Sequence, residues 1–313
     1  MSKNSDVYRS PFKKLSSSAL LDDHVGERIR LRPKRLYFDP DASILLVDEA
    51  LRGLSRKVRE ELLMLEFLRY ASFTSDLEDN LVCPATRSLL DPSASLPWRP
   101  CRESRQSDDA HRILVEEVVH GLEIARLMRA VRRKAGKRDV EFKSHAFLEE
   151  VDRMAREEDN LKDIIRLVAV CLTETLITTA LAVTPQSQAP LQKPVQRFFR
   201  GHDRDERKHR YYFQYVFRQL WPRLSAAQKE SIGPLLPRML AVYLTLDRKV
   251  FEAILGKFPA QVKDPAGTVE RIATHPGIQE RKRKSAASSI TMIEKAGAMT
   301  RSTRRLCRDL GLI

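Results

Sequence analysis

A single carboxylate in the most apolar stretch of the chain limits how the chain can fold. From Leu167 to Val183, Glu174 is the only ionisable side chain apart from Cys171, and its neighbours are apolar residues or threonine. The stretch is slightly shorter than the ~20 residues that span a bilayer. We therefore expect a buried helix. Its carboxylate then needs a proton, an arginine or a metal ion to offset the cost of burying a charge.

A glutamate and a histidine lie three residues apart in a second apolar segment. Glu117 and His120 share a helical face with Ile113 and Ile124, because residues three and four apart meet on one side of a helix. A metal ion would satisfy both side chains in a core, where an unpaired charge is costly. The alternative is a surface or salt-bridged pair, which the adjacent Glu116 would favour.

A third segment repeats this spacing and adds a histidine. His202, Glu206 and His209 are separated by four and three residues, which places them on one face of a helix. This spacing can direct an imidazole nitrogen and a carboxylate oxygen at one point, as in the Glu-x-x-His motifs of dinuclear helical bundles. Because Arg204 and Lys208 lie in the same run, a solvated charged face is the alternative.

The fourth carboxylate must be chosen among three acidic residues near the end of the first long helix. Asp76, Glu78 and Asp79 lie close together, and Leu81 and Val82 follow Glu78 at i+3 and i+4. Helix phase therefore favours Glu78 as the residue that faces the interior. A surface acidic cluster is the alternative.

Together these segments match the ligand pattern of a dinuclear bundle, with a contribution from each of four helices. The predicted ligands are Glu78, Glu117, His120, Glu174, Glu206 and His209, and His202 adds a seventh candidate. Oxygen-rich sites with some imidazole suit iron or manganese, whereas zinc prefers fewer ligands and often thiolate. The four cysteines lie far apart and form no ligand-like cluster.

Helical periodicity elsewhere predicts an all-α fold, and only 11 of the 313 residues are glycine. The expected helices cover 55–90 (interrupted near Pro84), 108–134 (closed by Gly136), 145–183 (broken near Asn160, ending before Pro185), 196–220, 226–258 (broken near Pro234 and Pro237) and 285–310. Prolines 190 and 194 are expected in a connection. A loop containing prolines 259, 265 and 276, followed by the basic run 281–284, is expected before the last helix.

The net charge of +14 favours acidic partners. A nucleic-acid-binding helical protein is one hypothesis that follows, but aromatic residues are few and are not interleaved with the basic runs, and it leaves Glu174 unexplained. No secretory signal is apparent and no cysteine pair has CxxC spacing. Reduced thiols in the cytoplasm are the expectation.

The chain resembles the ferritin-like di-iron N-oxygenases typified by p-aminobenzoate N-oxygenase. The resemblance covers roughly residues 60–215. It rests on Leu77-Glu78-Asp79-Asn80-Leu81-Val82-Cys83-Pro84, Glu117-x-x-His120, Thr173-Glu174-Thr175-Leu176-Ile177-Thr178 and His202-x-x-Asp205-Glu206-x-x-His209. The third histidine separates this family from generic ferritin-like proteins, and His202 matches it.

By this resemblance, the seven predicted ligands would hold two iron ions, with manganese less favoured, and O2 would be the co-substrate. An amine would be oxidised to a hydroxylamine, nitroso or nitro product, in natural-product biosynthesis. The substrate would be an aryl amine or an amino compound, free or tethered to an acidic carrier protein, and an external donor would supply electrons. A homodimer is a further expectation, with no membrane partner. The ligands alone also allow oxygenation or oxidation at carbon.

The resemblance and the periodicity together predict three parts. Residues 1–42 would form a basic N-terminal extension, 43–260 the ferritin-like di-iron bundle, and 261–313 a basic C-terminal loop and helix packing on the bundle. The basic stretches 126–138, 281–284 and 301–308 could dock an acidic carrier or attract a carboxylate. Ordinary solvated helix surface is the alternative for each.

Overall fold

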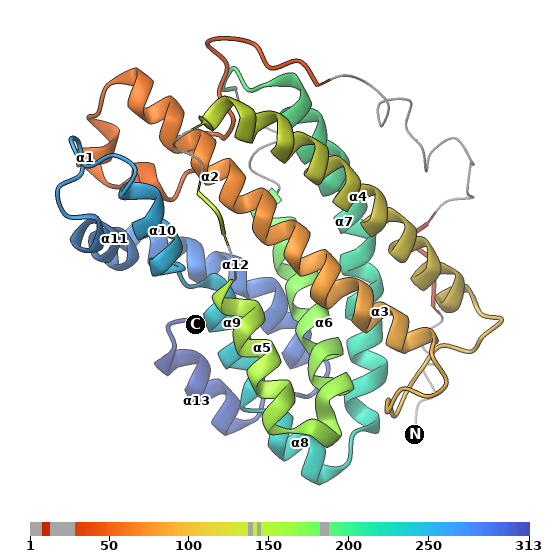
Figure 1. Cartoon of the computed structure of the whole chain (residues 1–313). Coiled ribbons are helices and arrows are strands. Elements are labelled where there is room, and N and C mark those ends of the chain that lie inside the picture. Colours follow the sequence, from red (N-terminus) through yellow and green to blue (C-terminus); the bar gives the residue numbers. More distant parts are fainter. Residues whose placement is uncertain (1–7, 13–28, 137–139, 143–144, 182–187) are drawn as a thin grey trace.

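Four long helices form a closed bundle in the computed structural model, which describes residues 8–12, 29–136, 140–142, 145–181 and 188–313. They are α2 (Arg56–Leu77), α4 (Arg105–Ala135), α6 (Lys162–Leu181) and α7 (Lys193–Leu220). Helix α2 packs on α4, α4 on α7 and α7 on α6, and the turn that follows α2 contacts α6 and closes the ring (Figure 1). The predicted all-α, ferritin-like fold is confirmed.

The first long helix changes its winding where a proline follows. Helix α2 continues without a break through a π-helical turn, η2 (Glu78–Val82), into α3 (Cys83–Leu90). Pro84 has no N–H to donate and its ring clashes with the carbonyl four residues earlier. A wider turn before it removes that conflict. The predicted interruption near Pro84 is therefore a π turn in a continuous helix.

Helix α4 is capped by Ser104 at its start and ends at Gly136, the residue predicted to close it. The Ser104 side chain accepts a hydrogen bond from the backbone N–H of Ser107 at the start. Gly136 ends the helix with φ of +56°, a conformation that favours glycine. The helix is slightly longer than the predicted range of 108–134.

The predicted break near Asn160 is confirmed. Helix α5 (Ala146–Glu157) ends there, and a 3-10 turn, η4 (Asp159–Leu161), leads into α6. The predicted end of this region before Pro185 lies outside the described residues. No helix in the described part of the chain is both long enough and apolar enough to cross a membrane.

Several prolines that were predicted to mark loops instead lie in the first turn of a helix. Pro194 is in the first turn of α7, so α7 starts earlier than the predicted residue 196. Pro265 begins α11 (Pro265–Thr274) and Pro276 begins α12 (Pro276–Lys295), where a loop was predicted. Proline is tolerated at these positions because the first N–H groups of a helix have no partner within it. The basic run 281–284 therefore lies within α12 and not before it.

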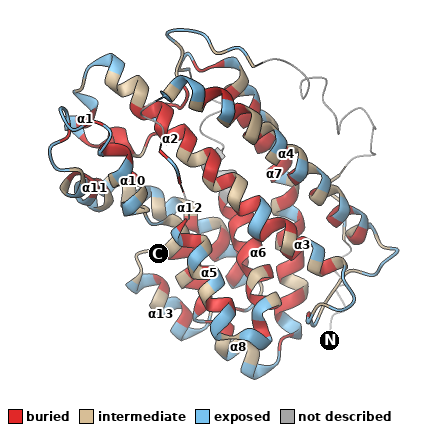
Figure 2. Cartoon of the chain, viewed as in Figure 1, coloured by how far each residue is buried: buried red, intermediate tan, exposed pale blue. Residues whose placement is uncertain are grey.

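The remaining helices surround the bundle. They are η1 (Leu45–Val47), α1 (Glu49–Arg52), η6 (Trp221–Arg223), α8 (Ala226–Ile232), α9 (Leu235–Leu244), α10 (Arg248–Leu255) and α13 (Arg301–Asp309). Helices α9 and α12 pack on α6, and α13 packs on α9 (Figure 1). Buried residues line the inner faces of the bundle helices, whereas α5 and α13 present exposed residues outward (Figure 2).

Part of the predicted N-terminal extension packs on the bundle. Phe38 is buried between Tyr70 of α2 and Phe199 of α7, with ring centroids 6.2 and 6.0 Å away. The backbone of Leu36 forms a short parallel bridge with Leu191, just before α7. One continuous apolar core joins these residues to the C-terminal helices. The division at residues 42 and 260 remains a prediction.

Candidate metal centre

The inner face of α4 carries the first glutamate–histidine pair. Ile113, Glu117, His120 and Ile124 are all buried, at intervals of three and four residues, whereas Val118 between them is 62% exposed. This periodicity turns one stripe of the helix toward α2 and α7. The alternative of a surface-facing Glu117 and His120 is therefore excluded.

Helix α7 turns its three predicted ligands to the same interior. His202, Glu206 and His209 are each no more than 1% exposed. The arginines of this run lie on the outer side, where Arg207 pairs with Asp203. The charged face and the buried histidine face are thus opposite sides of one helix.

The two lone carboxylates come from the other two walls of the bundle. Glu174 is 1% exposed on α6, and Glu78 is 2% exposed at the start of the π turn. Asp79 is exposed, and Asp76 lies 3.1 Å from the Nε2 atom of His145. Among the three acidic residues, only Glu78 faces the bundle interior.

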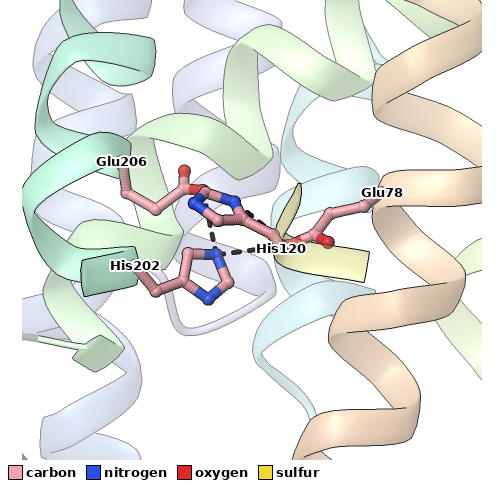
Figure 3. A group of neighbouring side chains, drawn as sticks. All are labelled: Glu78, His120, His202 and Glu206. Atoms are coloured by element: carbon pink, nitrogen blue, oxygen red, sulfur yellow. Dashed lines mark ion pairs between the residues drawn. The ribbon is translucent and has the colours of Figure 1, made fainter. Parts of the chain in front are cut away.

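The donor atoms of Glu78, His120, His202 and Glu206 gather in one group in which all lie within 4.8 Å of one another. The Nε2 atom of His202 is 2.9 Å from Glu206 Oε1 and 3.2 Å from Glu78 Oε1. The His120 and His202 rings are adjacent, with centroids 4.4 Å apart. Figure 3 shows the four side chains converging from three helical segments. This group could hold one metal ion.

A second group adjoins the first and shares one residue with it. It consists of Glu117, Glu174, Glu206 and His209, again with donor atoms within 4.8 Å of one another. The Nδ1 atom of His209 lies 2.9 Å from Glu117 Oε1, 3.5 Å from Glu206 Oε1 and 3.7 Å from Glu174 Oε2. Because Glu206 belongs to both groups, the seven side chains form one continuous cluster with two donor groups. The first group contributes two imidazoles and the second only one.

The cluster fits two divalent cations. Glu78 Oε2, His202 Nδ1 and Glu206 Oε2 are buried without a hydrogen bond within the described residues. Buried polar atoms of this kind are costly unless a partner satisfies them. Four carboxylates and three neutral imidazoles carry a charge that two divalent ions would balance. The donor set matches iron or manganese better than zinc.

The pKa values of the metal-free cluster show how closely its charges are packed. Burial, followed by the charge of Glu117, raises the pKa of Glu78 to about 7. Burial and the charges of Glu206 and Glu117 raise the pKa of Glu174 well above its usual range. Burial opposes the charged form of His209, but the carboxylates of Glu206 and Glu117 outweigh this effect and raise its pKa. A cation would relieve this crowding of carboxylates.

Two carboxylates to which the sequence assigned no role in the site hold the outer nitrogens of two histidines. His209 Nε2 lies 2.9 Å from Glu116 Oε2, and His120 Nε2 lies 3.4 Å from Asp205 Oδ2. A carboxylate only accepts hydrogen bonds, so each Nε2–H donates outward and leaves Nδ1 free to bind a metal. In the sequence alone, Glu116 favours a surface or salt-bridged position for Glu117 and His120. The available signal was that each acid directly precedes a predicted ligand glutamate.

His202 lacks such a partner. Its Nδ1 atom forms no hydrogen bond in the described part of the chain. Its ring packs against the edge of Phe198, with centroids 5.2 Å apart. The third histidine is therefore held by packing, whereas the other two are held by carboxylates.

Comparison with known proteins agrees with this arrangement. The family model described as P-aminobenzoate N-oxygenase AurF matches residues 22–297, a longer span than the predicted resemblance over 60–215. No curated protein sequence matches the chain. The members of this family are non-haem di-iron N-oxygenases, so the chain is an enzyme of this type. By its fold, its buried Glu/His cluster and this match over most of its length, the chain belongs to the p-aminobenzoate N-oxygenase AurF family.

Proposed function

We propose that this enzyme uses two iron ions and O2 to oxidise an amine nitrogen to a hydroxylamine, nitroso or nitro product. The observation that carries the proposal is the pair of buried donor groups sharing Glu206, in a chain of a di-iron N-oxygenase family. Cytoplasmic location and a role in natural-product biosynthesis are parts of the proposal that rest on the sequence alone.

We assign the seven side chains as the iron ligands. Glu78, His120 and His202 would hold one ion, Glu117, Glu174 and His209 the other, and Glu206 would contact both. The absence of cysteine from both groups, in the part of the chain that the structure describes, supports iron over zinc. Manganese remains the second choice because it prefers the same ligands.

The chain's own contribution is to hold the ligands, exclude water and place the substrate nitrogen. When bound, the two iron ions would supply the electrons that activate O2. Overall, one oxygen atom enters an N–H bond, the other leaves as water with two protons, and an external donor supplies two electrons. Phe198 packs against His202 and is backed by Phe199, and such apolar packing keeps solvent away from a reactive centre.

A small pocket between α4 and α7 is lined by Arg126, Arg197 and Glu123 together with Phe198, the residue that contacts His202. Its two arginines outnumber its one carboxylate, and a net positive surface attracts carboxylates and acidic carriers. We propose that the amine carries an acidic group or is tethered to an acidic carrier protein. A homodimer remains an expectation from the sequence.

The test begins with metal content. Protein loaded anaerobically with ferrous iron should bind about two ions per chain, and should consume O2 when a suitable amine is present. Incubation with a panel of aryl amines and amino compounds under isotopically labelled O2 should give products with labelled oxygen on nitrogen. A protein that takes up no iron or manganese would overturn the proposal. Label on carbon would instead favour a carbon oxygenase.

A further inference from the structure

One lysine lies between the two carboxylates that hold the outer nitrogens of His120 and His209. Lys208 Nζ is 2.5 Å from Glu116 Oε1 and 2.9 Å from Asp205 Oδ1. The three side chains are only 24%, 15% and 12% exposed, respectively. A solvated charged face was the alternative for this run, and it describes Arg207, which is 61% exposed, but not Lys208.

Both oxygens of each carboxylate are used, one on the lysine and one on a histidine. Glu116 receives Lys208 on Oε1 and His209 on Oε2. Asp205 receives Lys208 on Oδ1 and His120 on Oδ2. An unbroken chain of polar contacts therefore runs from His209 through Lys208 to His120.

We propose that Lys208 is a positioning residue that couples the two metal positions. This inference rests on the proposed function. His120 belongs to the group with two imidazoles and His209 to the group with one, so the chain of contacts joins one ligand of each position. Lys208 acts through Glu116 and Asp205 and touches neither donor group.

The physical basis is the orientation of the two imidazoles. A carboxylate on the outer nitrogen of a metal-binding histidine fixes the ring and raises its basicity. Without the ammonium group, Glu116 and Asp205 would be two partly buried anions with no shared cation, and would turn toward water. Within the described residues, Lys208 is the only lysine or arginine paired with Glu116, whereas Asp205 also contacts Arg204.

The surroundings of the lysine differ from those of an ordinary surface ion pair. Lys208 Nζ lies over the ring of Phe12, 4.9 Å from the ring centroid. The guanidinium carbon of Arg112 lies 5.8 Å from the same centroid. Exposed ion pairs contribute little because water screens them, but partial burial strengthens these contacts. Because Lys208 contacts both Glu116 and Asp205, a change in the orientation of the His209 ring can alter the orientation of the His120 ring, and the reverse.

Cobalt(II), added anaerobically to the full-length apoprotein, is the probe. Its visible spectrum should resolve two binding steps, because the two positions differ in imidazole number. We expect Lys208→Met to weaken both steps by about 10- to 100-fold, the range for loss of an outer partner of a metal ligand. Lys208→Arg should recover most of this loss. Arg207→Met is the matched control, because among the described residues Arg207 pairs only with Asp203. This variant should bind cobalt as the parent protein does.

Two further variants separate the two arms of the network. Glu116→Gln should weaken mainly the step that involves His209, and Asp205→Asn mainly the step that involves His120. Adding Glu116→Gln to Lys208→Met should weaken cobalt binding little further. Loss of the Lys208 ammonium group has then already released Glu116 from its position against His209. If Lys208→Met does not fold, as judged by circular dichroism, Lys208→Arg and these two variants still test the coupling.

The outcomes distinguish this inference from the proposed function. Unchanged cobalt binding in Lys208→Met, loss of only one step, or an equal loss in Arg207→Met would overturn the coupling while leaving the di-iron assignment intact. If the parent protein binds neither cobalt nor iron, the proposed function fails first. Weakening of both steps in Lys208→Met, with recovery in Lys208→Arg, supports the coupling.

Discussion

The Nε2 atom of His202 lies 2.9 Å from Oε1 of Glu206, one helical turn further along α7. This contact places a second imidazole in only one of the two donor groups. The two donor groups are therefore chemically different. The position with two imidazoles has more nitrogen ligands and fewer carboxylates, which favours the lower charge state of a bound ion.

Replacing this histidine tests that difference. His202→Ala should lower the iron content from about two ions per chain toward about one, since Glu78 and His120 alone would hold the first position with Glu206. Iron analysis after anaerobic loading and desalting measures the effect. His111→Ala is the control, because His111 is exposed on α4 and contacts only the Ser107 carbonyl in the described structure. Equal iron content in both variants would contradict the assignment.

Glu174 tests the other position. Glu174→Gln keeps the shape of the side chain but removes its charge, and we expect O2-dependent turnover to fall by more than ~100-fold, since loss of an outer partner alone costs about 10- to 100-fold. The measurement is the rate of O2 consumption with an amine that the panel identifies as a substrate. Asp163→Asn, on the same helix where Asp163 accepts a hydrogen bond from Ser95, should retain the parental rate.

The ligand-bearing faces were predictable because helical periodicity and burial cost act locally. Glu174 had no polar face to occupy, and Glu78 was selected over Asp76 and Asp79 by its phase with Leu81 and Val82. The structure buries Glu78 and Glu174. These inferences need only the spacing within one helix.

Contacts between helices were beyond the same reasoning. Glu116 meets Lys208 and His209 across the α4–α7 interface, and this pairing depends on how the two helices pack. Prolines 265 and 276 were assigned to a loop because proline ends helices as well as beginning them. Local sequence does not decide between those two roles.

Removing the metal should destabilise the protein. The cluster gathers four carboxylates in the core, and a ligand that binds only the folded state adds about 2.7 kcal/mol at 100 times its dissociation constant. Thermal unfolding in the presence of a chelator should therefore show a lower midpoint than with manganese or ferrous iron. Glu174→Gln should show a smaller metal-dependent shift. A midpoint that does not respond to metal in the parent protein would argue against a buried site.

Metal affinity should rise with pH. Burial and the charge of Glu117 raise the pKa of Glu78 to about 7. Burial and His120 oppose protonation of His202, but the carboxylates of Glu206 and Glu78 raise its pKa to about 9. A metal competes with these protons, so affinity should increase as pH passes through this window. Manganese titrations at several pH values measure how steeply metal affinity rises with pH. Glu78→Gln should make this rise less steep near pH 7, the lower end of the window. A flat profile would contradict the prediction.

The segment before α1 should contribute to stability. Phe38 is buried against Tyr70 and Phe199, so Phe38→Ala should lower the free energy of unfolding by about 3–5 kcal/mol. Urea denaturation followed by circular dichroism measures the loss. Tyr211 is 41% exposed, so Tyr211→Ala should change the free energy of unfolding by less than ~0.5 kcal/mol. Equal effects would show that residues near 38 are an appendage and not part of the core.

The π turn at Glu78–Val82 limits how the length of this chain can vary. Each residue rotates a helix by about 100°, and a π turn holds one more residue than an α-helical turn. If all five residues were kept and wound as a regular α-helix, α3 would rotate by about 100° relative to α2, carrying Ala85 and Leu89 out of the core. Relatives that wind regularly here but keep both the carboxylate and the packing of α3 should therefore lack one residue of this turn.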